Sequence, residues 1–385
     1  MNNKKNLLIP VRSTIVCLIC MSMIAGTMSF FYLQQNAIAT SNDNSVVQRS
    51  WQLIRGCVGS VCNNAPIPGF PFLNDAHIAD SESSSITQTV GQRIKQIEGS
   101  SAENLGANGV DINGATNMRT TQGIKQNIQN LGGDSSGQNN ADQFASTFGT
   151  TPSTLGTNDK NNEITQKSFQ NIRNLDGGSV ALNSIFHHAG PVGNDNDNNI
   201  IDETSIQTIQ NIDDESSATN RAINHGHAEF NSDNNRITDL NVQKISDVSG
   251  GSDATNSGPS THGGEGAANE ARFFHGSDNN NYEGTNEQTV ENIDHGSKAT
   301  NEAANEARVG EFQGDSDNNN IKQENKQEIK NVDHESEAEN EAENDVTIDN
   351  DSDDNDVKQS SKQEIKNVDG GSHARNSGGN SVNIS

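Results

Sequence analysis

Runs that alternate Asp and Asn recur along the chain, and their side-chain oxygens could bind a hard cation. Ca²⁺ takes six to eight oxygen ligands, which such runs can supply. Asp and Asn also start turns without any metal, and no run has the Gly and Glu positions of an EF-hand loop. Ca²⁺ is therefore an alternative that stays open, with these ligands: Asp195, Asp197, Asp233, Asp278, Asp315, Asp317, Asp351 and Asp353.

The ten histidines and the possible nucleophiles form no familiar catalytic pattern. His187-His188 and His225-x-His227 lack the spacing of a metal site, so no histidine cluster is expected. His295 and His334 stand where other repeats have the first Gly of a turn. No nucleophile elbow, phosphate loop or HExxH motif occurs. We expect no catalytic and no cofactor-binding residue, and a protein that is not an enzyme.

The N-terminal 39 residues are typical of an export signal. Lys4 and Lys5 precede an apolar run over 13–33, and Ala37-Ile38-Ala39 fits a cleavage site. Because the run spans about 20 residues, an uncleaved membrane anchor is the alternative. Either way we expect the rest to be secreted or at the cell surface, with membrane contact only through this segment.

Two of the four cysteines fall within the apolar run, and two follow it. Cys57 and Cys62 would lie in an oxidising compartment, and the short segment between them can close as a disulfide. They belong to a segment at 40–85 that differs from the rest through Trp51 and a group of prolines. We interpret this segment as a head or a cap.

Composition limits the size of the apolar core and the classes of molecule that the chain can bind. Net charge is −27, only 29% of residues are apolar and 4% are aromatic. A polyanion repels nucleic acid and attracts divalent cations, so nucleic acid is excluded as a partner and cations are not. So few apolar residues cannot fill a large core, and the chain must be repetitive or disordered.

Residues 86–385 are repetitive, in about seven to eight units. A glutamine recurs at intervals of 34 to 45 residues, at Gln92, Gln126, Gln170, Gln207, Gln243, Gln288, Gln327 and Gln363. Repeats of this length are typical of stacked arrays, in which each unit buries its face against its neighbours.

Within a unit, similar residues alternate with variable ones. Apolar, Gln and Asn residues occupy every second position over 321–331, and Ala, Ser and Asn do so over 297–309. Period two indicates strands, and Gly-Gly, His-Gly or His-Glu between the halves indicates a tight turn. We predict an all-β solenoid of strand-turn-strand units whose inward amides form ladders: Gln207, Gln243, Gln288, Gln327 and Gln363, with Asn211, Asn292, Asn331 and Asn367.

Two other folds stay open. Val90, Ile94 and Ile97 stand at helical spacing, as do Ile124, Ile128 and Leu131, and a following Gly-Gly could cap a short helix. Low apolarity with high charge is also typical of a largely disordered chain.

The repeat resembles the curlin-type repeats of bacterial amyloid fibres. The likeness is carried by Gln288-x-Val290-x-Asn292 followed by Ser297-x-Ala299-x-Asn301-x-Ala303. It implies a secreted structural or adhesive protein of the cell surface or extracellular matrix that self-associates into fibres. A calcium-binding adhesin that folds on metal binding and a disordered acidic coat protein are the alternatives.

Overall fold

The computed structural model describes most of the chain, and every element in the described part is a strand. The solenoid prediction is confirmed, and the helical and disordered alternatives are wrong for these residues. They are 35–39, 45–58, 61–64, 74–79, 84–99, 101–113, 117–146, 160–190, 197–228, 233–257, 269–274, 278–311, 317–348 and 354–384.

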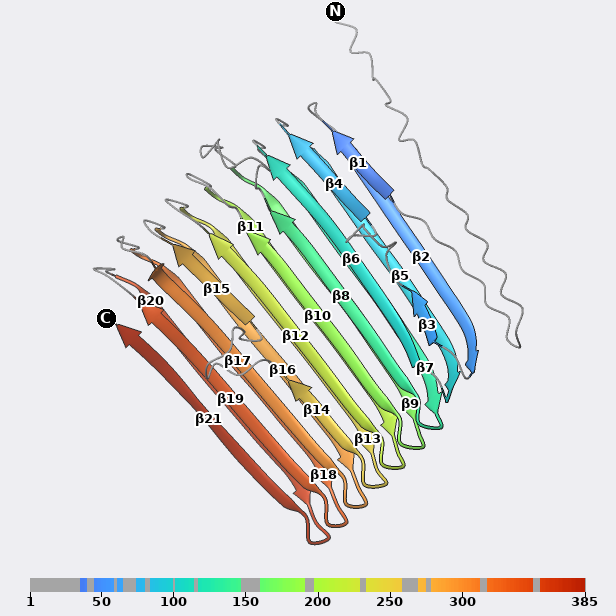
Figure 1. Ribbon diagram of the computed structural model, residues 1–385. Helices are drawn as coiled ribbons and strands as arrows, with labels where there is room; N and C mark the ends of the chain where they lie inside the picture. The colour runs from blue at the N-terminus through green and yellow to red at the C-terminus, as the bar shows by residue number, and fades with distance from the viewer. Residues whose placement is uncertain are drawn as a thin grey trace, which may run out of the picture.

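Parallel strands from successive coils form two sheets (Figure 1). The nine-stranded sheet holds β2 (Ser45–Val58), β5 (Ser85–Glu98), β7 (Arg119–Gly132), β9 (Glu163–Leu175), β11 (Ile200–Ile212), β13 (Arg236–Val248), β16 (Asn281–Ile293), β18 (Asn320–Val332) and β20 (Asp356–Val368). The twelve-stranded sheet holds β1 (Gln35–Ala39), β3 (Val61–Asn64), β4 (Asn74–Ala79), β6 (Ser101–Asn113), β8 (Ser136–Ser146), β10 (Val180–Gly190), β12 (Ser217–Ala228), β14 (Asp253–Ser257), β15 (Asn269–Phe274), β17 (Lys298–Glu311), β19 (Glu337–Ile348) and β21 (His373–Ile384).

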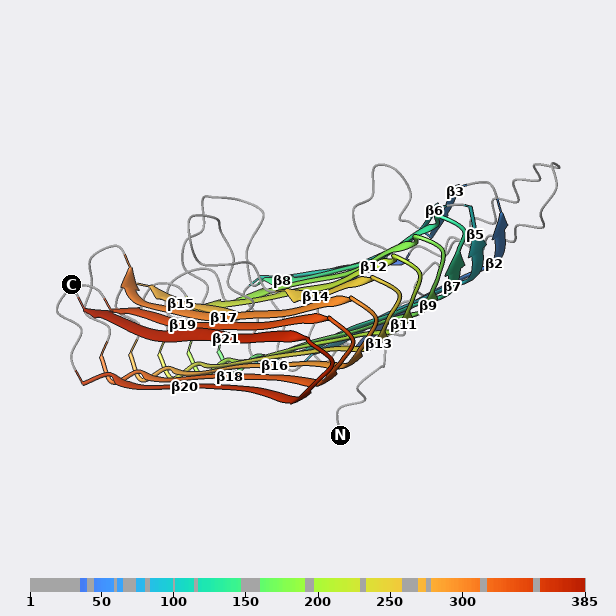
Figure 2. The same ribbon diagram turned by 90° about the horizontal axis from the view of Figure 1, so that it is seen from below.

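The two sheets face each other, and each coil crosses from one to the other through a tight turn (Figure 2). Residues at the turn have positive φ, as at Gly250 (67°), Gly251 (73°), His334 (51°) and Glu335 (59°). Glycine adopts this left-handed backbone at no steric cost, which explains the Gly-Gly pairs. The turn predicted from the sequence is confirmed.

Most apolar side chains lie at the two ends of the coil interior, and amides fill most of the positions between them. One cluster near the tight turns contains Ile209, Ile245 and Ile329, and another at the opposite end contains Ile201, Ile237 and Ile321. All six are fully buried. The alternation predicted from the sequence therefore positions the core, and the polar centre must be stabilised by hydrogen bonds.

One part of the predicted ladder faces the other way. Asn211, Asn292, Asn331 and Asn367 were expected to point inward, but their side chains are exposed. Each has positive φ, between 55° and 61°. This left-handed residue interrupts the alternation, so the next residue, such as Ile212 or Val332, takes the inward position. The four asparagines still bond to counterparts in adjacent coils, as in Asn331 to Asn292 at 2.8 Å, but on the outside.

The segment over 40–85 supplies the first coil. Strand β2 pairs in parallel with β5, and β3 and β4 pair with β6, so its described strands continue the same stack. Strand β1, inside the predicted signal or anchor, pairs with β4, while residues 1–34 lie outside the described part. Within the described residues, no helix is long and apolar enough to span a membrane.

Candidate functional site: the amide ladders and the last coil

A column of glutamines runs along the centre of the solenoid. In every step the Nε2 atom of one glutamine donates to the Oε1 atom of the glutamine one coil earlier, at 2.7–2.9 Å from Gln126 through Gln363. The same amide also reaches the opposite sheet, as in Gln207 Nε2 to the Arg221 carbonyl at 2.7 Å. Each buried amide thus joins neighbouring coils and both sheets.

A second column, of asparagines, runs along the twelve-stranded sheet. Here the Nδ2 atom donates to the Oδ1 atom of the next coil, at 2.8–2.9 Å, through Asn104, Asn139, Asn183, Asn220, Asn256, Asn301, Asn340 and Asn376. The two columns therefore point in opposite directions. Glutamines donate toward the N-terminus and asparagines toward the C-terminus.

The columns end at the last coil, β20 and β21, whose inward side chains are uncovered. Asn340 is 0% exposed, whereas its counterpart Asn376 in β21 is exposed. Among the described strands, none pairs with the outer edge of β20 or β21. Gln363 thus presents its Oε1 atom as an acceptor at this end, and Asn376 presents its Nδ2 atom as a donor.

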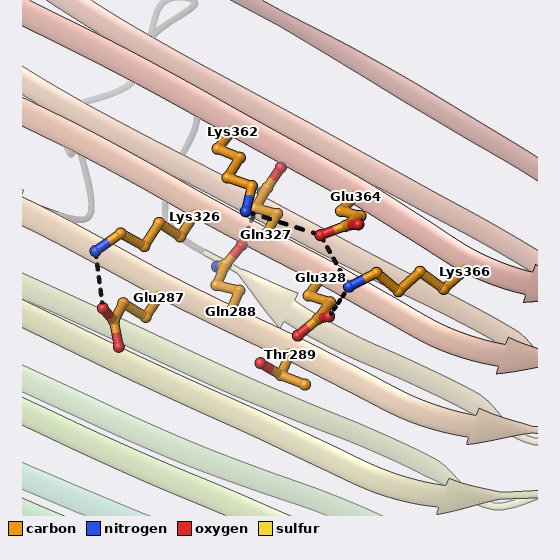
Figure 3. Close-up of a pocket in the computed structure, with 9 residues that line it drawn as sticks. All are labelled: Glu287, Gln288, Thr289, Lys326, Gln327, Glu328, Lys362, Glu364 and Lys366. Atoms are coloured by element: carbon orange, nitrogen blue, oxygen red, sulfur yellow. Dashed lines mark hydrogen bonds and ion pairs between the residues drawn. The ribbon is translucent and has the colours of Figure 1, made fainter.

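In the last coils, charged residues gather on the outer face of the nine-stranded sheet and pair within and between strands (Figure 3). Lys326 contacts Glu287 at 3.2 Å, and Lys366 contacts both Glu328 and Glu364 at 3.0 Å. They line a shallow depression of about 320 Å³. Such exposed pairs contribute little stability each, but they keep this face hydrated.

A second glutamine column, from Gln88 through Gln122 to Gln166, meets two acids in the next coils. Glu203 and Asp239 occupy the same position, and both are fully buried. Burial is the main cause that raises the pKa of each carboxyl well above its ordinary value. The Gln166 Oε1 atom lacks a hydrogen-bond partner among the described residues, and the carboxyls of Glu203 and Asp239 lie close enough to interact with each other. If the Glu203 carboxyl keeps its proton, its O–H can donate to the Gln166 Oε1 atom, as the N–H of a glutamine does elsewhere in the column.

Four of the eight predicted calcium ligands are described, and they stand at one position in successive coils. The Asp197 Oδ1 atom accepts the backbone N–H of Asp233 at 3.2 Å. Asp233 does the same for Asp278, and Asp278 for Asp317, at 2.9 and 2.8 Å. Lys160 donates to the other oxygen of Asp197 at 2.7 Å. Asp195, Asp315, Asp351 and Asp353 lie outside the described residues.

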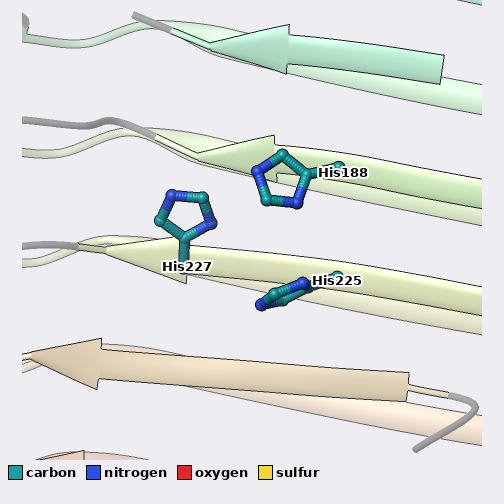
Figure 4. A group of neighbouring side chains, drawn as sticks. All are labelled: His188, His225 and His227. Atoms are coloured by element: carbon teal, nitrogen blue, oxygen red, sulfur yellow. The ribbon is translucent and has the colours of Figure 1, made fainter. Parts of the chain in front are cut away.

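The expectation that the histidines do not converge is wrong. His188 in β10 and His225 and His227 in β12 form a group in which one ring nitrogen of each lies within 4.8 Å of those of the other two (Figure 4). Burial lowers the pKa of His188 and of His225 to about 4 each and holds that of His227 well below its usual range. The missed signal is the 37-residue spacing between His188 and His225, which equals the offset of the paired Asn183 and Asn220.

The structure places Cys57 at the end of β2 and Cys62 in β3, on either side of a short connection. Their side chains lie outside the described part, so the disulfide stays a prediction.

Comparison of the chain with protein-family models, with curated proteins and with solved structures gave no match. The resemblance to curlin-type repeats therefore stays a prediction, and function must be argued from the geometry of the coils.

Proposed function

We propose that the chain is an exported structural or adhesive protein of the cell surface or extracellular matrix whose molecules stack end to end. The observation that supports this most is the uncovered last coil. Among the described residues, buried amides of earlier coils find partners on both sides, whereas those of β20 and β21 find partners on one side. Unsatisfied amides and strand edges are favourable templates for another chain.

The direction of the columns specifies how two molecules would meet. A coil docked on this end in the same register and direction would place a donor above Gln363 and an acceptor above Asn376, as the coils inside the solenoid do. Two last coils brought together would instead oppose acceptor to acceptor along the glutamine column. The geometry thus favours head-to-tail growth over pairing of like ends.

Strand β20 also lacks the protection that edge strands often carry. Inward-pointing charges prevent edge pairing in many β proteins. The inward positions of β20, from Val357 through Gln359 and Gln363 to Ile365, are all uncharged. Its lysines, Lys358, Lys362 and Lys366, lie on the outer face with the rest of the charge. Repulsion between the charged outer faces of the last coils would limit side-by-side association there.

Electron microscopy and thioflavin binding of residues 35–385 would test this proposal. We expect unbranched fibres, and we expect Gln363→Lys to abolish them because it places a charge inside the junction. Glu364→Lys, on the opposite face of the same strand, is the matched control and should leave fibres intact. Monomers at all concentrations, or fibres that Gln363→Lys does not affect, would refute end-to-end stacking.

The aspartate column supports a second candidate, a calcium-binding adhesin. Asp197, Asp233, Asp278 and Asp317 stack at one edge, and one oxygen of each of the first three accepts the backbone N–H of the next aspartate in the column. Lys160 already pairs with the other oxygen of Asp197, and a cation bound between Asp233 and Asp278 would relieve the repulsion of these two adjacent carboxylates. Circular dichroism with and without millimolar Ca²⁺ separates the candidates: the first requires the β spectrum without Ca²⁺, and the second requires a Ca²⁺-dependent gain in β signal or in melting temperature.

A further inference from the structure

Three histidines meet on the outer face of the twelve-stranded sheet, at adjacent coils. His188 is in parallel register with His225, so the two imidazoles stand one coil apart. His227 follows two residues later on the same strand. The ring centroids lie 5.0 Å apart for His188 and His225, 4.9 Å for His188 and His227, and 5.7 Å for His225 and His227. Parallel stacking alone brings the three rings together.

We propose that His188, His225 and His227 bind one divalent transition-metal ion of the Zn²⁺ class and thereby link β10 to β12. Zn–N bonds of about 2.0–2.1 Å in tetrahedral geometry put ligand nitrogens about 3.4 Å apart. The nitrogens already lie within 4.8 Å of one another, so rotation of the side chains closes the site without a change in register. Imidazole suits Zn²⁺, Ni²⁺ and Cu²⁺, whereas Ca²⁺ requires oxygen.

The backbone makes room for this group. A Cβ atom added to Gly190 would lie 2.7 Å from the Cε1 and Nδ1 atoms of His227 and 2.6 Å from its carbonyl oxygen. No side chain larger than hydrogen fits there while His227 keeps its place. The glycine at the end of β10 therefore leaves the space that the third imidazole occupies.

Neighbouring side chains border the group on both sides. The Phe144 ring stacks on His188 with the ring centroids 5.1 Å apart and the planes 1° apart. On the other side, Glu270 is in register with His225, and Arg272 ion-pairs with Glu270. The carboxylate offsets the guanidinium charge, which would otherwise disfavour a cation here. Hydrogen-bonding and packing partners of this kind orient metal-binding histidines.

Three protein nitrogens leave one position of a tetrahedral ion for water or for a group from another molecule. The ion would be bound by two coils at mid-length of the solenoid, away from the last coil. This site is independent of end-to-end stacking, and either proposal can fail without the other.

Titration calorimetry of the untagged full chain with Zn²⁺ tests the site, with Co²⁺ absorption as a second readout. The background variant His295→Asn/His334→Asn removes the other stacked histidine pair, whose centroids lie 5.1 Å apart. We expect it to keep one Zn²⁺ site and to give the intense visible bands of tetrahedral Co²⁺. Adding His225→Asn should weaken Zn²⁺ binding by more than about 100-fold, beyond the 10–100-fold typical of lost supporting residues.

Gly190→Ala provides a variant that keeps all three imidazoles. It should displace His227 and weaken Zn²⁺ binding while the circular dichroism spectrum stays that of the parent. Absence of a Zn²⁺ site in the background variant would overturn the proposal. Equal affinity with and without His225 would do so too, as would octahedral Co²⁺ spectra. If His225→Asn does not fold, Gly190→Ala decides, and unchanged affinity there refutes the site.

Discussion

Replacing the buried acids Glu203 and Asp239 with their isosteric amides should stabilise the solenoid at neutral pH. Both carboxyls are fully buried at one position of a glutamine column, and no cation pairs with either among the described residues. Glu203→Gln would supply the N–H donor that the Gln166 Oε1 atom lacks. The double variant Glu203→Gln/Asp239→Asn therefore completes the column and removes two titrating groups.

The magnitude follows from proton linkage. Burial raises both pKa values in the folded state, so the acids retain protons that the unfolded chain releases above its ordinary pKa near 4. Their contribution to the free energy of unfolding is complete below about pH 4 and is lost as the pH rises through the pKa of the folded state. Each retained proton lowers the free energy of unfolding by about 1.4 kcal/mol per pH unit. For each carboxyl that keeps its proton over the range from pH 5 to pH 7, this loss is about 3 kcal/mol.

Urea unfolding followed by circular dichroism at pH 5, 6, 7 and 8 measures this slope. We expect the wild type to lose stability with pH relative to the double variant, and the two to converge near pH 4. Asp253→Asn/Glu337→Gln, two exposed acids at strand starts, matches the change in net charge and should keep the wild-type slope. Parallel curves for the wild type and the double variant would show that the buried acids ionise in the folded state, and the reasoning would be refuted.

Gln207→Leu leaves the Gln170 Oε1 and Gln243 Nε2 atoms without their partner in the column. At about 1–3 kcal/mol for each group left without its partner, the free energy of unfolding should fall by about 2–6 kcal/mol. A change of less than about 0.5 kcal/mol in urea unfolding would contradict the ladder. Asn331→Val should be less stable than Asn331→Gly by about 1–2 kcal/mol, because Asn331 has a φ of 56°, which β-branched residues disfavour. Equal melting curves for the two variants would argue against the left-handed conformation of this residue. Asp294 raises the pKa of His334, so Asp294→Asn should shift the NMR titration of His334 to lower pH, and an unchanged titration would exclude the contact.

Much of the fold could be predicted because the signals are local. Alternation of period two over 321–329 identifies strands, and the recurrent glutamine sets the register between coils. The inward prediction for Asn331 failed because one left-handed residue reverses the alternation. That conformation depends on how the chain enters the tight turn, and an asparagine in a regular pattern gives no sign of it.

The histidine group and the two buried acids were harder to predict from the sequence. His188 and His225 are far apart in sequence, and they become neighbours only through the parallel register. Glu203 and Asp239 look like surface acids in a chain rich in them, and their burial follows from occupying a glutamine position. Both groups become visible once the repeats are aligned by coil and the columns are read across them.

Distance measurement between spin labels at positions 130 and 367 tests the parallel, in-register stack most directly. Asn130 and Asn367 are equivalent outward residues in β7 and β20, which six strand spacings separate in the nine-stranded sheet. With the native cysteines replaced by serine, spacings of about 4.8 Å predict a narrow distribution centred at about 29 Å, widened by the label linkers. A broad distribution, or a narrow one centred well away from that value, would contradict the solenoid and every ladder built on it.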